Sequence, residues 1–252
     1  MKHGCGLATA IRTLTIFTVR GNESKSPATA LYWFVPVGLL LGAVIALVGY
    51  LGVSLQLPAV GGALAVAFLA LLTRGFHLDG LADMADGFGG GWTVERRLEI
   101  MKDSHIGAFG VIALVLVLII KTVAIASIIE RQVWVPLLFV PVFSRFFVVV
   151  QSVANTYARS EEGTAGRLVK ESSMKHLVVS ALWILIICLL FSTSYLVLCA
   201  VLAGTGGVTT LWIALHANKR INGVTGDILG ATVELNEAVL CCVMAVFLTL
   251  PI

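Results

Sequence analysis

The chain has 252 residues, of which 58% are hydrophobic and only 12% are charged, whereas soluble globular proteins carry about 25% charged residues. The apolar residues are gathered in long blocks, so the composition argues against an ordinary soluble protein and indicates a polytopic membrane protein built from helices. The net charge of +3 is too small to indicate a nucleic-acid partner. We therefore expect an all-α fold, with one membrane-embedded helical bundle over residues 1–252.

The apolar blocks predict the elements in chain order. Residues 11–19 form an apolar run too short to cross a bilayer, which predicts an interfacial or re-entrant helix. Seven spans are then expected, two of them within 177–217 and turning near residues 192–194. The spans are 31–53, 59–73, 106–129, 133–154, the two within 177–217, and 238–252. Polar stretches at 77–103, 155–176 and 218–237 separate them.

Basic residues are distributed unevenly between the loops. If the N-terminus is cytoplasmic, fourteen of the 17 Lys and Arg residues fall in cytoplasmic segments and only Arg131 falls outside. Lys121 and Arg145 lie within spans. The positive-inside rule therefore predicts a multi-pass protein with a cytoplasmic N-terminus. All three polar stretches would then lie on the cytoplasmic side, and membrane lipid is an expected partner.

The stretch 77–103, HLDGLADMADGFGGGWTVERRLEIMKD, holds six of the 14 carboxylates. Asp79, Asp83 and Asp86 are spaced i, i+4 and i+7, which places them on one face of a helix. Glu99 and Asp103 repeat the i, i+4 spacing after three glycines. Like charges stacked in this way repel, so we expect a cation to lie against them.

Carboxylates with few histidines and no nearby cysteine favour a hard cation, so we expect Mg²⁺, with Mn²⁺ as an alternative. Magnesium held by a few carboxylates typically shares its coordination shell with substrate phosphates. A solvated acidic loop is the other interpretation, and carboxylates at helical spacing close to lipid argue against it. His77 is a candidate ligand or proton carrier, and a hydrogen-bonded interfacial histidine is at least as compatible with its position.

The other two polar stretches contain candidate phosphate-binding residues. Arg159 lies in the first, and Lys219 and Arg220 precede turn-forming residues in the second, where Asp227 follows. Basic side chains beside such turns suit phosphoryl oxygens, although an ordinary positive-inside loop is an equal alternative. Arg145 is a sharper signal, because a cation within a span is normally functional or paired. We expect it to project toward the acidic stretch.

Four segments together resemble a known family: HLDGLADMADG (77–87), RRLEIMKDSHIGAFG (96–110), TYARSEEG (156–163) and KRINGVTGDILGATVEL (219–235). They are similar to cobalamin synthase, also called adenosylcobinamide-GDP ribazoletransferase. The one departure is Asn222, where the family pattern has a second glycine. The resemblance implies a single catalytic domain in the bacterial inner membrane, with its active site on the cytoplasmic side.

The resemblance also implies a reaction. A ribose hydroxyl of α-ribazole, or of its 5′-phosphate, would displace GMP from adenosylcobinamide-GDP, giving adenosylcobalamin or its 5′-phosphate, with Mg²⁺ required. We expect a metal site from Asp79, Asp83, Asp86 and Glu99, and a general base in Asp103, with Asp79 second. The expected substrate-binding residues are His77, Arg145, Arg159, Lys219, Arg220 and Asp227.

Two alternatives remain open. Asp83-x-x-Asp86-Gly followed by Glu99-x-x-x-Asp103 is loosely similar to CDP-alcohol phosphotransferases, but the Ala-Arg pair of that pattern is missing after Gly87. A secondary transporter is less favoured, because transport usually needs ionisable groups or broken helices at the membrane midplane. The sequence leaves the oligomeric state open, a homo-oligomer included.

Overall fold

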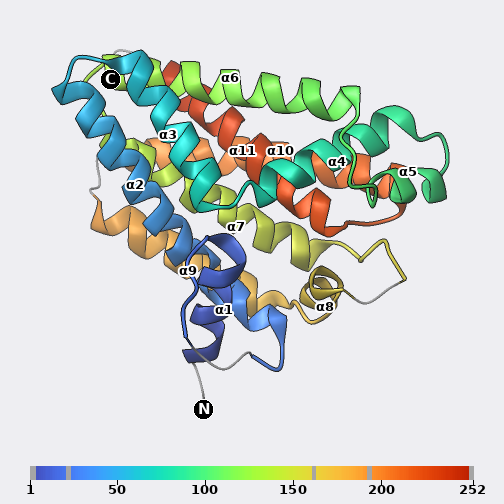
Figure 1. Cartoon of the computed structure of the whole chain (residues 1–252). Coiled ribbons are helices and arrows are strands. Elements are labelled where there is room, and N and C mark those ends of the chain that lie inside the picture. The colour runs from blue at the N-terminus through green and yellow to red at the C-terminus, as the bar shows by residue number, and fades with distance from the viewer. Residues whose placement is uncertain (1–3, 21–23, 161–162, 192–194, 250–252) are drawn as a thin grey trace.

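The computed structural model describes the chain except residues 1–3, 21–23, 161–162, 192–194 and 250–252 (Figure 1). In the described residues the regular elements are all helices, accompanied by an isolated bridge between Tyr157 and Val224. The predicted all-α fold is confirmed. The turn predicted near 192–194 lies outside the described residues.

The helices pack into one bundle. In chain order they are α1 (Gly4–Leu14), η1 (Pro27–Trp33), α2 (Phe34–Ser54), α3 (Pro58–Leu72), α4 (Phe76–Gly90), α5 (Val94–Ile100), α6 (Ala108–Glu130), η2 (Val135–Leu138), α7 (Phe139–Ala154), α8 (Thr164–Lys170), α9 (Met174–Leu190), α10 (Leu196–Ile221) and α11 (Gly226–Phe247). Among the described residues, five helical segments are long and apolar enough to cross a membrane, or up to seven if each of two bent pairs is one span. The chain is therefore a multi-pass membrane protein by helix length and composition, and the seven predicted spans match the upper count.

Two predicted boundaries were wrong. Helix α11 runs unbroken from Gly226 to Phe247, although its first half was expected in a polar loop. Its carboxylates Glu234 and Glu237 face the bundle interior, where ion pairing allows their burial. At the N-terminus, α1 ends at Leu14 instead of continuing to residue 19, because the Thr15 hydroxyl makes local bonds that compete with the helix.

A sharp bend after α3 sends α4 across the bundle. Arg74 and Gly75 both have left-handed φ angles, 55° and 64°, and the axes of α3 and α4 differ by 90°. Helix α4 then packs against α6 and α11 (Figure 1). At Gly80 the approach is so close that an added Cβ would lie 2.9 Å from the carbonyl oxygen of Asp227. A glycine at this position thus lets α4 reach the start of α11.

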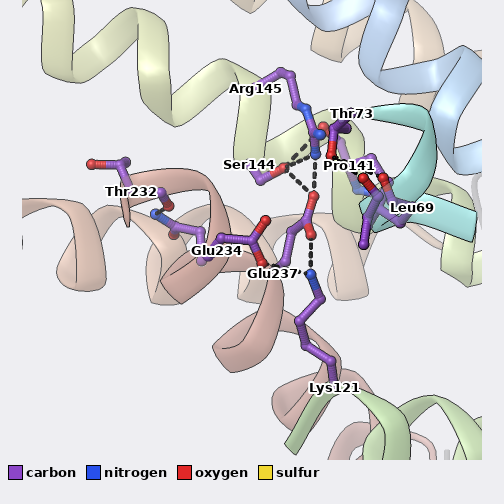
Figure 2. A network of polar contacts seen from close by, with 11 residues as sticks. Leu69, Thr73, Lys121, Pro141, Ser144, Arg145, Thr232, Glu234 and Glu237 are labelled. Carbon is purple, nitrogen blue, oxygen red and sulfur yellow. Dashed lines mark hydrogen bonds and ion pairs between the residues drawn. The ribbon is translucent and has the colours of Figure 1, made fainter. Parts of the chain in front are cut away.

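A buried ionic network joins α6, α7 and α11 (Figure 2). Lys121 Nζ lies 2.9 Å from Glu234 Oε2 and 2.5 Å from Glu237 Oε2. The second oxygen of Glu237 accepts hydrogen bonds from Arg145 and Ser144. Two cations and two carboxylates therefore balance one another inside the bundle. The fully buried guanidinium of Arg145, expected to project toward the acidic stretch, has its ion-pair partner in Glu237 of α11.

Candidate active site

A cavity of about 820 Å³ lies beside the N-terminal part of α4 and the loop after α5. Asp79, Asp83 and Asp103 line it, together with Lys102 and His105. Its size falls within the range of small-molecule sites. The structure thus brings Asp103 to the same cavity as Asp79 and Asp83, although Asp103 lies beyond the end of α5 and Glu99, its i, i+4 partner, does not line the cavity.

A second cavity of about 210 Å³ adjoins the first, since Asp79 lines both. Its lining also includes Tyr157, Arg159 and Asp227. Arg159 Nη2 donates to Asp227 Oδ2 at 2.8 Å, and its Nε is buried without a hydrogen-bond partner in the described structure. The guanidinium is therefore oriented by a carboxylate and keeps a donor for another acceptor.

The loop after α7 reaches Asp227 through backbone pairing. Ala158 N donates to Val224 O, and Val224 N donates to Thr156 O, both at 2.9 Å. This pairing begins just after Asn222, which ends α10 with a left-handed φ of 60°. Glycine and asparagine both adopt that conformation readily, which explains why the departure at Asn222 leaves the turn intact.

The joined cavities have an excess of negative charge. The negative charges of Asp227, Asp79 and Asp86 repel the carboxylate of Asp83, and the positive charge of Arg159 attracts it. Four carboxylates, Asp79, Asp83, Asp103 and Asp227, line the joined cavities against three basic side chains, Arg74, Lys102 and Arg159, which leaves a net excess of one negative charge. The electrostatic field of the site therefore favours a bound cation.

The donor set fits magnesium bound together with a phosphate. In the part of the chain that the structure describes, no three Asp, Glu, His or Cys side chains are grouped closely enough to hold a metal by themselves. Magnesium is commonly held by one or two protein carboxylates plus waters and substrate phosphates, so it needs no such cage. Asp79 and Asp83, which line the same cavity, supply oxygen donors of that kind.

Asp103 is engaged with His105 at the rim of the larger cavity. The ring Nδ1 of His105 lies 2.7 Å from Asp103 Oδ1, and the backbone N–H of His105 donates to the same oxygen at 3.0 Å. These hydrogen bonds, from the ring first and the backbone second, hold the pKa of Asp103 below its usual range. A lowered pKa makes this carboxylate a weaker base than expected.

Two of the expected metal ligands lie outside the joined cavities. Asp86 is buried and accepts backbone N–H bonds from Gly107 at 2.7 Å and Gly110 at 2.9 Å, so it caps the start of α6. Glu99 is exposed and pairs with Arg96 at 2.6 Å. Asp86, at the i+7 position on α4, therefore binds backbone N–H groups at the start of α6, whereas its spacing predicted a metal ligand.

Four expected substrate-binding residues also lie elsewhere, one of them Arg145 in the buried network. His77 is buried and lines a small apolar cavity of about 110 Å³. Lys219 and Arg220 line a separate cavity with Arg97. Two residues that line the joined cavities, Lys102 and Tyr157, were not predicted from the sequence. Both belong to the segments that carry the family resemblance. Their closeness in sequence to the predicted residues Asp103 and Arg159 was the signal that could have identified them.

Comparison with known proteins identifies the family. The family described as cobalamin-5-phosphate synthase matches residues 6–245. The chain belongs to this family. A relative from Prosthecochloris aestuarii, named adenosylcobinamide-GDP ribazoletransferase, is 43% identical over 238 residues, covering 94% of this chain and 96% of the relative. A relative of the same name from Chlorobium phaeobacteroides is 39% identical over 245 residues, covering 97% and 98%. No solved structure matches the chain.

Family membership confirms the resemblance and makes the chain an enzyme of the transferase class. Each of the four segments that carried the resemblance contributes a residue to the joined cavities. These residues are Asp79 and Asp83 from 77–87, Asp103 from 96–110, Arg159 from 156–163 and Asp227 from 219–235. The joined cavities are therefore the candidate active site of this cobalamin-5-phosphate synthase family member.

Proposed function

We propose that the chain joins adenosylcobinamide-GDP to α-ribazole or its 5′-phosphate in a Mg²⁺-dependent reaction. The products would be GMP and adenosylcobalamin or its 5′-phosphate. The observation that carries the proposal is the meeting of Asp79, Asp83 and Asp227 with Arg159 around adjoining cavities. Carboxylates that can hold a metal, beside a guanidinium that binds phosphoryl oxygens, suit a diphosphate substrate.

Different side chains would bind the metal ion and the phosphoryl oxygens of the diphosphate. Asp83 would hold Mg²⁺ together with the substrate phosphates, and the bound ion would supply charge neutralisation as GMP departs. Arg159 would donate to a phosphoryl oxygen through its unpartnered Nε, while Asp227 keeps the guanidinium in place. This arrangement orients the phosphorus on the cobinamide side toward the incoming hydroxyl.

We assign the proton transfer to Asp79 in preference to Asp103. Asp79 lies where the two cavities meet, so its carboxylate can reach a hydroxyl bound beside the diphosphate. Asp103, in contrast, is held by His105, and its lowered pKa weakens it as a base. The ribose oxygen would form the new bond to phosphorus as Asp79 takes its proton, and the bond to GMP would break.

We further propose that the active site faces the cytoplasm of a bacterial cell, with the chain in the inner membrane and its N-terminus inside. Support comes from the basic residues, fourteen of 17 in the segments assigned to that side. Nucleotide substrates are cytoplasmic, which agrees with this orientation.

The proposal is tested with purified protein in lipid nanodiscs, by following GMP release with mass spectrometry as Mg²⁺ is titrated. Asp83→Asn should lower turnover by about 10²-fold or more, because a group that organises the charged diphosphate is lost. Glu95→Gln, an exposed change of equal charge on α5, should retain turnover. Unchanged GMP release in Asp83→Asn would exclude the mechanism. Release of CMP from a CDP-linked substrate would favour the phosphotransferase alternative.

A further inference from the structure

A basic cavity of about 460 Å³ lies apart from the candidate active site and shares no lining residue with it. Its lining contains Arg97, Lys219 and Arg220 and no carboxylate. Among the described residues, no acidic side chain forms an ion pair with any of these three cations. We call this cavity the basic pocket. Three uncompensated cations around one hollow indicate an anionic ligand.

The two arginines of the basic pocket are held in place by backbone carbonyls. Arg220 Nη1 donates to Phe88 O at 2.6 Å, and its guanidinium lies 5.3 Å from the centre of the Phe88 ring. Arg97 donates to Gly91 O at 3.0 Å and to Arg220 O at 2.9 Å. These bonds satisfy the carbonyl ends of α4 and α10 and leave the positive charges unneutralised. Each guanidinium has five N–H donors, so donors remain for a ligand.

The basic pocket is lined in part by α10, whose exposed surface suits lipid. Val208, Leu211 and Leu215 are exposed apolar residues on this candidate span. Trp212, 54% exposed, and then Lys219 follow toward the end of the helix. An apolar face that ends in tryptophan and then lysine is typical of the boundary between the hydrocarbon core and the headgroups.

An adjoining cavity of about 330 Å³ extends the basic pocket along this surface. The two cavities share Phe88, Gly89, His216 and Arg220, and the second adds Met84, Trp212 and Ile213. A charged hollow thus continues into a less polar one beside the lipid-facing helix. This order, phosphate-binding cations first and apolar groups next, matches the order of groups in a phospholipid.

We propose that the basic pocket binds the headgroup phosphate of an anionic phospholipid. Trp92, 89% exposed at the rim, would lie against the headgroup region, where tryptophan is favoured. A soluble nucleotide is the less suitable ligand, because the pocket is lined by the last turns of the candidate span α10 and has no lining residue in common with the candidate active site. The inference does not depend on the proposed reaction.

Native mass spectrometry of the full-length protein with an equal mixture of phosphatidylglycerol and phosphatidylcholine tests the proposal. Phosphatidylglycerol should be retained preferentially. Lys219→Gln should weaken that preference by about fivefold, the effect of removing one cation that attracts an anionic lipid. Lys219 is exposed and makes no hydrogen bond in the described structure, so this variant should fold normally. Arg97→Gln should act in the same direction, with its melting temperature measured alongside.

Lys175→Gln is the matched control, since Lys175 is an exposed lysine on α9 that does not line the basic pocket. It should leave the lipid preference unchanged. An equal loss in Lys175→Gln would overturn the proposal, because overall charge would then explain the preference. Displacement of phosphatidylglycerol by GMP or inorganic phosphate at similar concentrations would also overturn it, by identifying the pocket as a site for soluble phosphates.

Discussion

Replacement of Glu237 by glutamine should destabilise the bundle severely. Glu237 is fully buried and accepts hydrogen bonds from Lys121, Arg145 and Ser144. Among the described residues it is the only carboxylate paired with Arg145, so the substitution leaves a buried guanidinium uncompensated. Breaking a buried pair on one side costs about 3–5 kcal/mol, a large part of the roughly 5–15 kcal/mol that stabilises a typical protein.

The assay is thermal unfolding of the purified variant in detergent. For a chain of this size the loss corresponds to a melting temperature lower by about 6–20 °C. Glu234→Gln is the matched control, because Lys121 keeps Glu237, and it should cost only about 1.5–3 kcal/mol.

A double-mutant cycle separates pairing from packing. Adding Arg145→Gln to Glu237→Gln removes both charges, so the double variant should be more stable than the sum of the single losses predicts, by about 1–3 kcal/mol. Additive losses, or a melting temperature of Glu237→Gln within about 2 °C of the parent, would refute the reasoning.

Two further predictions concern the edges of the candidate active site. Asp86→Ala should lower stability by about 1–2 kcal/mol through the lost cap of α6, measured by thermal unfolding; a changed Mg²⁺ requirement at unchanged stability would instead assign Asp86 to the metal. Asn222→Gly should leave activity and melting temperature nearly unchanged, whereas Asn222→Ala should cost about 1 kcal/mol, because alanine resists the left-handed conformation of this residue; equal stability of the two variants would contradict this account.

The sequence predicted the all-α fold class and the helical placement of Asp79 and Asp83 on α4, because both depend on local patterns. Long apolar blocks identify spans by composition, and carboxylates at helical spacing mark α4. The role of Asp86 was not predictable from its spacing, since its partners Gly107 and Gly110 come 21 and 24 residues later. Only the packing of α4 against α6 decides whether that carboxylate binds backbone or faces the cavity.

The carboxylates of α11 illustrate a second limit. Polar residues lower the hydropathy of the segment that contains Asp227, Glu234 and Glu237, so a composition-based reading places it in a loop. The burial of Glu234 and Glu237 depends on Lys121 and Arg145, which are more than 80 residues away in the chain. Pairing between helices that are distant in sequence depends on the tertiary structure, so it cannot be deduced from the hydropathy of a single segment.

The distribution of charge in the buried network has a consequence for how the protein is made. Lys121 and Arg145 leave the ribosome well before Glu234 and Glu237, so α6 and α7 enter the bilayer while their countercharges are still untranslated. Each such cation near the middle of an isolated helix costs about 2.5–3.5 kcal/mol to insert. Electrical neutrality is reached only when α11, the last helix among the described residues, arrives. A chain truncated before α11 would therefore leave two unpaired cations in the membrane, and cellular quality control would recognise the truncated chain by these buried charges.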